Sequence, residues 1–193
     1  MDRDLELSLV ARLKCGDEGA FDTVYDVFRA PLFSFVLRLV VRRAIAEELS
    51  QEAWLRVTAT AHRLRADTRL APWLFTVARN LCLSYWRSHG GGEPRAIPVG
   101  GIDVPDHSRP TPQEQAEGGE LRRRLERALA GMLPADREVL LLVGVEGMAP
   151  AEAAEVIGVR PEALRKRLQR ARDRLALVLE SDQGDAGGRR GAP

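Results

Sequence analysis

Cysteine is scarce in this chain of 193 residues, with Cys15 and Cys82 as its only two examples. They lie far apart and form no CxxC pair, so the sequence predicts neither a zinc site nor a disulfide-built scaffold. Histidine is nearly as scarce, with only His62, His89 and His107. The chain also has no nucleophile elbow and no phosphate-cradling GxxxxGK motif. These absences argue against an enzyme, and we expect no catalytic residue and no bound metal.

Long apolar runs are missing as well. No run approaches the roughly 18 residues that a membrane span needs, and the longest candidate, Leu32 to Val41, is interrupted by Ser34 and Arg38. The first residues show no basic start followed by an apolar stretch and a small-residue cleavage site. We therefore expect a cytoplasmic protein that neither crosses a membrane nor leaves the cell. Unpaired cysteines fit that reducing compartment.

Neither sign of charge is in excess overall, because 29 Lys and Arg stand against 28 Asp and Glu, for a net charge of +1. Only the distribution of charge is therefore informative. Residues 160–174 hold seven basic side chains and two acidic ones, whereas residues 1–30 hold seven acidic and four basic ones. The basic segment is where we expect a polyanion such as nucleic acid to bind.

Composition changes abruptly at Ser88, and the stretch from there to Pro112 holds five Gly and five Pro. Such a composition is typical of a flexible linker. On both sides of it, apolar residues recur at helical spacing. The sequence therefore predicts an all-α fold of two small helical domains, residues 1–88 and 113–180, joined by a flexible linker, residues 89–112. A disordered tail, residues 181–193, is expected to follow.

Before the linker, apolar spacing predicts a series of short helices. They are expected over residues 5–15, 19–28, 31–43 and 45–61, with one more that begins at Pro72. The apolar stripe of this last helix consists of Leu74, Val77, Ala78, Leu81 and Tyr85. The opposite face, predicted to be exposed, is basic and amide-bearing and consists of Thr76, Arg79, Asn80, Leu83 and Arg87.

After the linker, the pattern ends in a short helix, a turn with Gly158 and a longer basic helix, which is typical of a helix-turn-helix. The expected helices cover residues 113–130, 135–145, 150–156 and 161–180. An apolar stripe on the last helix is formed by Leu164, Leu168, Ala171, Leu175 and Val178.

Lys166, Gln169 and Arg170 lie opposite this stripe, with Arg165 and Arg167 beside them. Such a face suits the major groove, because Arg and Lys reach guanine acceptors, Gln pairs with adenine, and flanking Arg holds phosphates. The alternative is an ordinary solvated charged face. The turn and short helix in front of it favour the DNA-binding interpretation.

Two separate blocks of the chain resemble a known family. Residues 135–142 (ADREVLLL), 146–148, 153–159 and 164–172 resemble the minus-35-reading domain of extracytoplasmic-function (ECF) sigma factors, in the sigma-70 family. Residues 47–56 (EELSQEAWLR) resemble the family's polymerase-clamp-binding helix, and residues 73–81 (WLFTVARNL) resemble its minus-10-reading helix. The resemblance covers about residues 5–88 and 113–179, in the right order and spacing.

The resemblance implies an alternative sigma factor that binds core RNA polymerase and directs it to promoters. The implied partners are the clamp helices of the largest subunit, the flap of the second largest, promoter DNA and an anti-sigma factor, with no cofactor. The implied polymerase-binding residues are Glu47, Glu48, Gln51 and Glu52. The implied minus-10 residues are Arg65, Asp67, Thr76, Arg79, Asn80, Leu83 and Arg87. The implied minus-35 residues are Arg165, Lys166, Arg167, Gln169 and Arg170.

In the family, the loop that here spans residues 64–70 captures a base extruded from the nontemplate strand, which requires a pocket to offset the lost stacking. Trp73 and Trp86 are candidates for stacking on bases, although a core position suits Trp73 better. The chain departs from the family at Ala149 and Arg160, which replace residues that usually cap the two helices of the helix-turn-helix. Pro150 and Pro161 are expected to compensate by preorganising the first turns.

A different class of function also fits the last helix. An autonomous transcriptional regulator would bind an operator through the same helix-turn-helix, as a dimer. That alternative leaves the acidic helix at Glu47 to Glu52 and the rest of the first domain unexplained. Binding to core polymerase discriminates the two, because only a sigma factor requires it.

Overall fold

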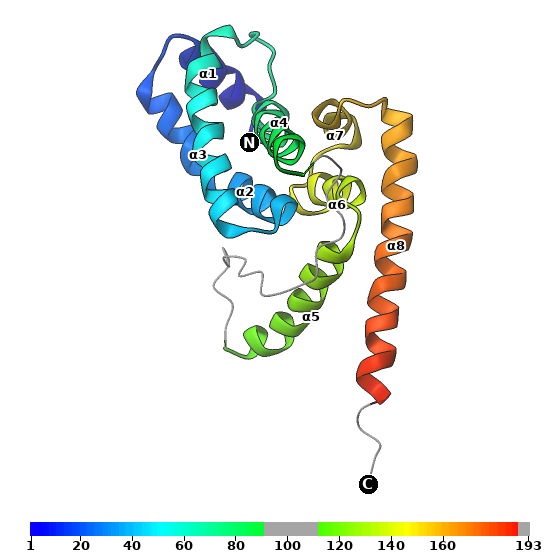
Figure 1. Ribbon diagram of the computed structural model, residues 1–193. Coiled ribbons are helices and arrows are strands. Elements are labelled where there is room, and N and C mark those ends of the chain that lie inside the picture. Colours follow the sequence, from blue (N-terminus) through cyan, green and yellow to red (C-terminus); the bar gives the residue numbers. More distant parts are fainter. Residues whose placement is uncertain (91–111, 189–193) are drawn as a thin grey trace.

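The computed structural model describes the backbone of residues 1–90 and 112–188, and all regular structure in these residues is helical (Figure 1). Residues 91–111, most of the predicted linker, lie outside the described residues. The helices on either side reach into the predicted linker, since α4 ends at Gly90 and α5 begins at Pro112. No helix in the described residues is both long and apolar enough to cross a membrane.

The N-terminal unit consists of α1 (Arg3–Lys14), α2 (Glu18–Val40), α3 (Arg43–Thr60), the short 3-10 helix η1 (Ala61–Arg63) and α4 (Leu70–Gly90). Two aspartates start the first two helices. The carboxylate of Asp2 accepts a hydrogen bond from the Asp4 amide, and that of Asp17 accepts one from the Ala20 amide. These carboxylates satisfy amides that have no partner within the helix.

The two helices predicted over residues 19–28 and 31–43 are in fact one helix, α2, with Pro31 inside it. A proline in a helix interior removes one hydrogen bond and costs about 3 kcal/mol. Burial of Val24 before it and of Leu32 and Phe35 after it stabilises the helix by roughly 1.5–3 kcal/mol for each side chain. Tertiary packing therefore outweighs the local preference of proline.

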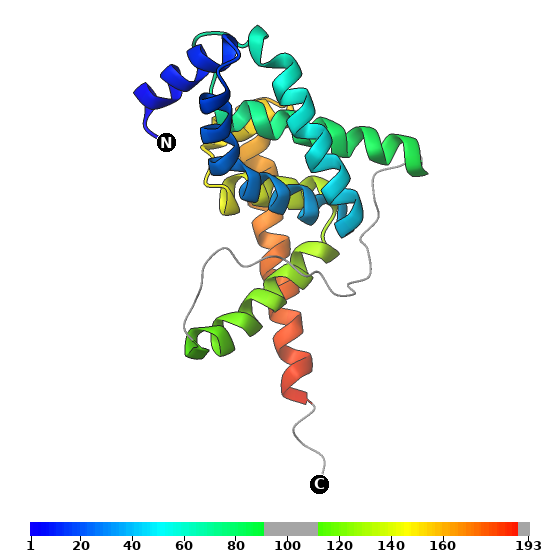
Figure 2. The same ribbon diagram turned by 90° about the vertical axis from the view of Figure 1, so that its left-hand side faces the viewer.

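The C-terminal unit consists of α5 (Pro112–Gly131), α6 (Pro134–Leu140), the π-helical turn η2 (Leu141–Val145), α7 (Pro150–Ile157) and α8 (Pro161–Gly188). Gly158, in the left-handed conformation with φ of 75°, ends α7 and produces the predicted turn between α7 and α8. Figure 2 shows α5 crossing α8, where the Arg124 guanidinium donates to the Leu179 carbonyl.

The last helix differs from its prediction in two respects. It continues through residues 181–188, where the sequence predicts the start of a disordered tail. Residues 189–193 lie outside the described residues. In the apolar stripe, Leu164, Leu168 and Ala171 are buried as predicted, but Val178 is exposed because α8 has by then passed the end of the core.

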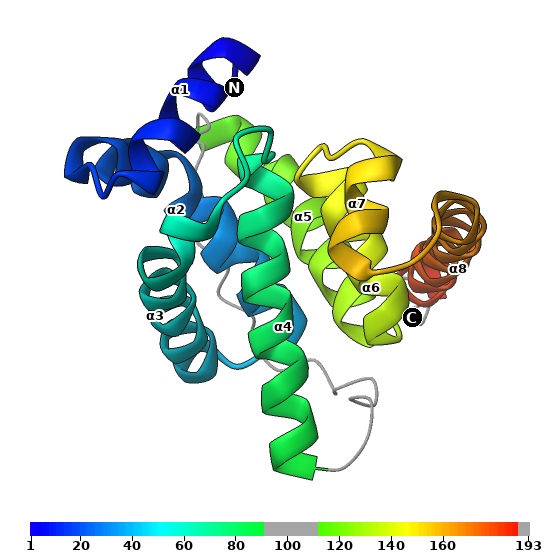
Figure 3. The ribbon, with the colours of Figure 1, turned by 90° about the horizontal axis from the view of Figure 1, so that it is seen from above.

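The two units pack against each other, which the sequence did not predict. Seen from above, α4 lies between α3 on one side and α6 and α7 on the other (Figure 3). The contacts pair α4 with α7 and α2 with α6. One apolar cluster runs through both units: Phe35 and Phe75 meet edge to face in the first, and Val139, Leu141 and Leu164 are buried in the second.

Arg137 on α6 is the largest fully buried side chain, with 1% of its surface exposed. Its guanidinium donates to backbone carbonyls at the ends of two helices and just beyond them. Those carbonyls belong to Leu129, Ala130 and Met132 around the end of α5, and to Arg38 and Leu39 at the end of α2. Burial lowers the pKa of Arg137 to about 10, so the group keeps its charge at neutral pH.

Replacing Leu168 with Ala should destabilise the C-terminal unit by about 2–5 kcal/mol, through lost apolar contact and the cavity left behind. Leu177 is the matched control, because it is on the same helix and 66% exposed. Leu177→Ala should change stability by no more than about 0.5 kcal/mol. Urea unfolding followed by circular dichroism measures both. Equal losses would show that the buried face of α8 has been misassigned.

Candidate nucleic-acid interface

The outer face of α8 presents most of the predicted minus-35 residues to solvent. Arg165, Lys166, Gln169 and Arg170 are exposed and Arg167 is half-buried. Two of these side chains make hydrogen bonds within α8. Gln169 donates to the Asp173 carboxylate at 2.9 Å, and Arg170 donates to the Lys166 carbonyl at 3.3 Å. A helix with one buried stripe and one exposed face of long donors has the shape that enters a major groove.

The helix in front of it, α7, starts without the side-chain cap that the family usually has at Ala149. The Glu152 carboxylate accepts a hydrogen bond from the Ala149 amide at 3.0 Å, which supplies a partner for that amide. Pro150 occupies the first helical position, where its missing N–H costs nothing. Besides Pro150, a carboxylate in the same first turn therefore supports the start of α7.

On α4, the predicted minus-10 face is only partly accessible. Asn80 and Arg87 are exposed, whereas Thr76 and Leu83 are half-buried. Arg79 was predicted to be exposed, but its side chain is only 15% exposed and pairs with Glu138 of α6, whose side chain is 8% exposed. The prediction was wrong because periodicity identified the polar face of α4 but not the helices of the other unit that cover it.

Two more ion pairs join the units. Arg38 of α2 pairs with Glu126 of α5 at 2.7 Å, and Arg69 before α4 pairs with Glu152 of α7 at 2.8 Å. In these two pairs and in the Arg79–Glu138 pair, the arginine belongs to the N-terminal unit and the glutamate to the C-terminal unit. The C-terminal unit therefore places carboxylates against a basic surface of the N-terminal unit.

Burial at the same interface also affects Glu146, which follows η2. It raises the pKa of Glu146 to about 7, and the nearby positive charge of Arg38 opposes that shift. The Glu146 carboxyl group is therefore partly protonated near neutral pH.

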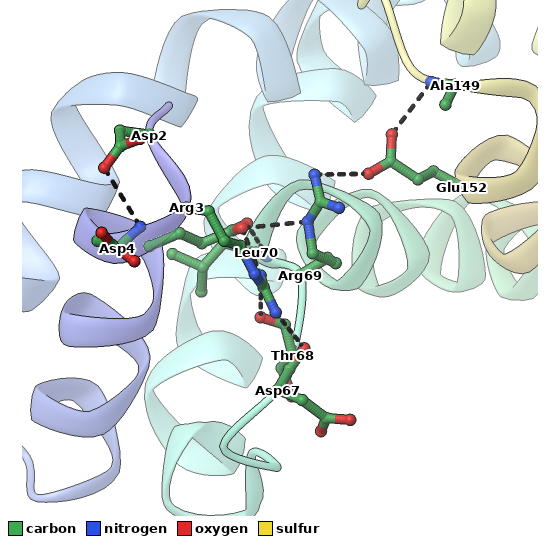
Figure 4. A network of polar contacts seen from close by, with 10 residues as sticks. Asp2, Arg3, Asp4, Asp67, Thr68, Arg69, Leu70, Ala149 and Glu152 are labelled. Carbon is green, nitrogen blue, oxygen red and sulfur yellow. Dashed lines mark hydrogen bonds and ion pairs between the residues drawn. The ribbon is translucent and has the colours of Figure 1, made fainter.

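The loop between η1 and α4 carries the predicted residues Arg65 and Asp67. They pair with each other at 3.1 Å while both side chains stay largely exposed. The hydrogen bond from Arg65 lowers the pKa of Asp67, so the carboxylate is charged at neutral pH. The loop backbone is held by Arg3 and Glu6 of α1. Figure 4 shows Arg3 beside Asp67 and Thr68.

Neither Arg3 nor Glu6 was identified from the sequence. A signal was present, since Glu6 shares the buried face of α1 with Leu9, Val10 and Leu13. An acid within an apolar stripe is unusual enough to mark a position with a specific partner.

The predicted polymerase-binding residues lie on one accessible helix, α3. Glu47, Glu48 and Gln51 are exposed and Glu52 is half-buried. Glu47 pairs with Arg43, and Glu52 pairs with Arg56, in both cases one turn away on the same helix. Figure 3 shows α3 on the side of α4 that faces away from α7 and α8, so the C-terminal unit does not cover these residues.

The two tryptophans considered for base stacking and the two cysteines differ in exposure. Trp73 and Trp86 are both half-buried and pack against the core. Cys82 is buried, and burial raises the pKa of its thiol to about 12. Cys15 is exposed.

Comparison with known proteins identifies the family to which this chain belongs. Residues 24–91 match the family model for sigma-70 region 2, and residues 122–175 match that for sigma-70 region 4. The chain is 30% identical over 174 residues to the RNA polymerase sigma factor CarQ of Myxococcus xanthus, covering 87% of this chain and 94% of CarQ. This chain belongs to the ECF family of RNA polymerase sigma factors.

A second relative of this sigma factor is the ECF RNA polymerase sigma factor EcfG of Rhodopseudomonas palustris, 31% identical over 152 residues, which cover 78% of this chain and 80% of EcfG. Among solved structures, the sigma factor RpoE of Bartonella quintana, in complex with the anti-sigma factor NepR, shares the fold. Its TM-score is 0.67 at 24% identity, over 84% of this chain and 98% of that one. The region 2 match contains α3 and α4, and the region 4 match contains α6, α7 and most of α8.

As a sigma factor, the protein binds core RNA polymerase and directs it to specific promoters for transcription initiation. Its sigma-70 region 2 and region 4 imply promoter recognition.

Charge reversal at Glu138 should loosen the contact between the two units of this sigma factor, because Lys at that position would face Arg79 in a poorly hydrated interface. The radius of gyration measured by small-angle X-ray scattering should rise for Glu138→Lys. Glu155→Lys, on the exposed side of α7, is the control and should leave it unchanged. Circular dichroism checks that both variants keep their helices. An unchanged radius for Glu138→Lys would contradict this assignment of the interface.

Proposed function

We propose that this ECF sigma factor acts in the cytoplasm as a non-catalytic adaptor with two functional domains, residues 1–88 and 113–180. The first binds the polymerase clamp and the minus-10 element, and the second binds the minus-35 element. The observation that carries this proposal is the face of α8, where Arg165, Lys166, Gln169 and Arg170 are exposed opposite a buried stripe. The other contacts follow from surfaces on α3, α4 and the loop before α4.

The clamp helices of the largest polymerase subunit bind α3 in this proposal. Glu48 is exposed without an ion pair among the described contacts, and Gln51 presents an exposed amide. Glu47 and Glu52 pair only with Arg43 and Arg56 of their own helix. Exposed pairs of this kind contribute little to stability and exchange readily for a partner's charges. An acidic and amide-bearing face of this kind fits a basic partner surface.

For the minus-10 element, the proposed residues are Arg65, Asp67, Thr76, Arg79, Asn80, Leu83 and Arg87. Arg79 bonds Glu138 in the free protein and becomes available only when α6 moves away from α4. In this proposal polymerase binding separates the units, and the phosphates of the DNA then replace the carboxylates. The isolated protein therefore binds promoter DNA weakly, both because α4 is covered and because specificity is shared between two linked sites.

The flap of the second largest subunit binds the far end of the C-terminal unit in this proposal. Leu133, Leu177 and Val178 are exposed there and line a surface cavity of about 390 Å³. An exposed apolar cluster of this kind is typical of a protein-binding surface. Leu177 and Val178 lie about two turns farther along α8 than Arg170, so this site is displaced along the helix from the proposed minus-35 residues.

An anti-sigma factor is proposed as a further partner. The related sigma factor RpoE was solved with the anti-sigma factor NepR bound to it. The closed arrangement of the two units here leaves the acidic face of α3 uncovered while it covers Arg79. An inhibitor that binds the closed form stabilises it by mass action and keeps the protein from polymerase.

Reversing the charges of Glu48 and Glu52 to Lys should weaken binding to core polymerase by at least roughly tenfold, because two repulsive contacts replace two attractive ones. Asp22 and Asp26 provide a matched control, since they are exposed acids with the same spacing on α2. Their reversal should leave the affinity nearly unchanged. Fluorescence anisotropy with labelled protein measures both. Equal affinities for the two double variants would refute the clamp assignment, and the autonomous regulator would predict that outcome.

Replacing Arg170 with Ala should remove about 1–3 kcal/mol of discrimination at one or two minus-35 positions, because a base contact is lost. Arg167→Ala should weaken all promoters about equally and flatten the salt dependence, because Arg167 flanks that face and its predicted contact is a phosphate. Transcription of a minus-35 library with core polymerase distinguishes the two. A uniform loss of output for Arg170→Ala would show that this residue does not read bases.

A further inference from the structure

The side chain of Glu6 on α1 is only 6% exposed, yet it has several polar contacts. Figure 4 shows two of its partners, Arg3 and Arg69, close to Leu70. One carboxylate oxygen accepts a hydrogen bond from the Leu70 amide at 2.8 Å. The other pairs with Arg3 at 2.6 Å and with Arg69 at 3.1 Å. Leu70 is the first residue of α4, so Glu6 satisfies one of the amides that a helix start leaves without an internal partner. Its negative charge also lies at the positive end of the α4 dipole.

Arg3 holds the preceding residues of the same loop. Its guanidinium donates to the Asp67 carbonyl at 2.9 Å and to the Thr68 carbonyl at 3.5 Å. Together, Arg3 and Glu6 bind the loop backbone at Asp67, Thr68 and Leu70. All of these contacts span more than sixty residues of sequence. They add to a local turn in which the Thr68 amide donates to the Arg65 carbonyl at 3.1 Å.

Burying the carboxylate of Glu6 carries a free-energy cost, because the charged group loses its hydration. It lies on the buried face of α1 beside Leu9 and Val10, where an apolar side chain would pack without losing hydration. A buried carboxylate is stabilising only when its hydrogen bonds and opposite charges are all in place. Meanwhile the side chains of Arg65 and Asp67 point to solvent, 85% and 70% exposed. The backbone of the loop is thus held in place, while the side chains of Arg65 and Asp67, which pair with each other, remain accessible to a ligand.

We propose that Arg3 and Glu6 are positioning residues for minus-10 recognition: they hold the loop of residues 65–70 in the conformation that receives an unpaired base of the promoter. This inference rests on the proposed assignment of that loop to the minus-10 strand. A base that leaves the DNA stack loses a few kcal/mol, and a loop that is already ordered adds no further ordering cost. Arg3 and Glu6 act through the loop and make no contact with DNA themselves.

Three variants separate the contributions of the pair. Glu6→Gln keeps an oxygen that can accept from the Leu70 amide but removes the charge that holds Arg3 and Arg69. Glu6→Leu removes both contacts while it suits the apolar surroundings, and Arg3→Ala releases the carbonyls of Asp67 and Thr68. Asp4→Asn is the matched control for Glu6→Gln, because Asp4 is exposed on the same turn of α1.

The experiment is transcription with core polymerase on two promoter libraries, one randomised at minus-10 and one at minus-35. Glu6→Leu and Arg3→Ala should reduce the preference at the captured minus-10 base by about tenfold, the factor that one charge-assisted hydrogen bond contributes. Glu6→Gln should reduce this minus-10 preference by a smaller factor, and Asp4→Asn should leave it unchanged. The minus-35 preferences and the affinity for core polymerase should not change in any variant.

Hydrogen exchange of the full-length protein gives a readout independent of transcription. Glu6→Leu should speed exchange of the Leu70 amide while amides in the middle of α1 and α4 stay protected, which also shows that the variant is folded. Unchanged exchange at Leu70, or an equal loss of minus-10 and minus-35 preferences, would overturn the proposal.

Asn80→Ala separates this proposal from the assignment on which it rests. If Asn80→Ala alters minus-10 preference and the Glu6 and Arg3 variants do not, only the positioning role fails. If Asn80→Ala and all loop variants leave minus-10 preference intact, the assignment of α4 and its loop fails with it.

Discussion

The arrangement of both units depends on the hydrogen bonds that the Arg137 guanidinium donates. The last carbonyls of a helix have no partner within it, and burying them without donors is costly. Arg137 supplies donors in a planar fork to carbonyls around the end of α5 and at the end of α2. Lys, with a single ammonium group, could not reach both sets at once. One side chain therefore organises the C-terminal unit and also seats it on the N-terminal unit.

Around this buried centre, ion pairs accompany the apolar contact that joins the two units. Arg38, Arg69 and Arg79 of the N-terminal unit meet Glu126, Glu152 and Glu138 of the C-terminal unit. The carboxylates of the C-terminal unit thus lie beside arginines that could bind DNA phosphates instead. Ion pairs at an interface exchange partners at a smaller net cost than buried apolar surface, because solvent or another anion can replace each acid. Such an interface suits a protein whose units must separate to work.

Periodicity predicted the all-α fold, the helix-turn-helix and the exposed face of α8, because each follows from which side of one helix is apolar. It failed where another part of the chain decides the outcome. Pro31 lies inside α2 because apolar contacts on both sides hold the helix. Arg79 is covered because α6 comes to lie against α4. The loop before α4 depends on Arg3 and Glu6, which are more than sixty residues away in sequence.

The division of charge between the two units has a consequence for biosynthesis. Translation completes α1 to α4 before Glu126, Glu138 and Glu152 have been added to the chain. The growing polypeptide therefore carries Arg38, Arg69 and Arg79 for a time without these carboxylates, and α2 without the guanidinium of Arg137. During that interval the ribosome's own RNA is the nearest abundant polyanion, and the emerging N-terminal unit meets it with its basic surface uncovered. Only the completed chain has the carboxylates that cover these arginines. The basic surface is therefore exposed early in synthesis and covered at its end.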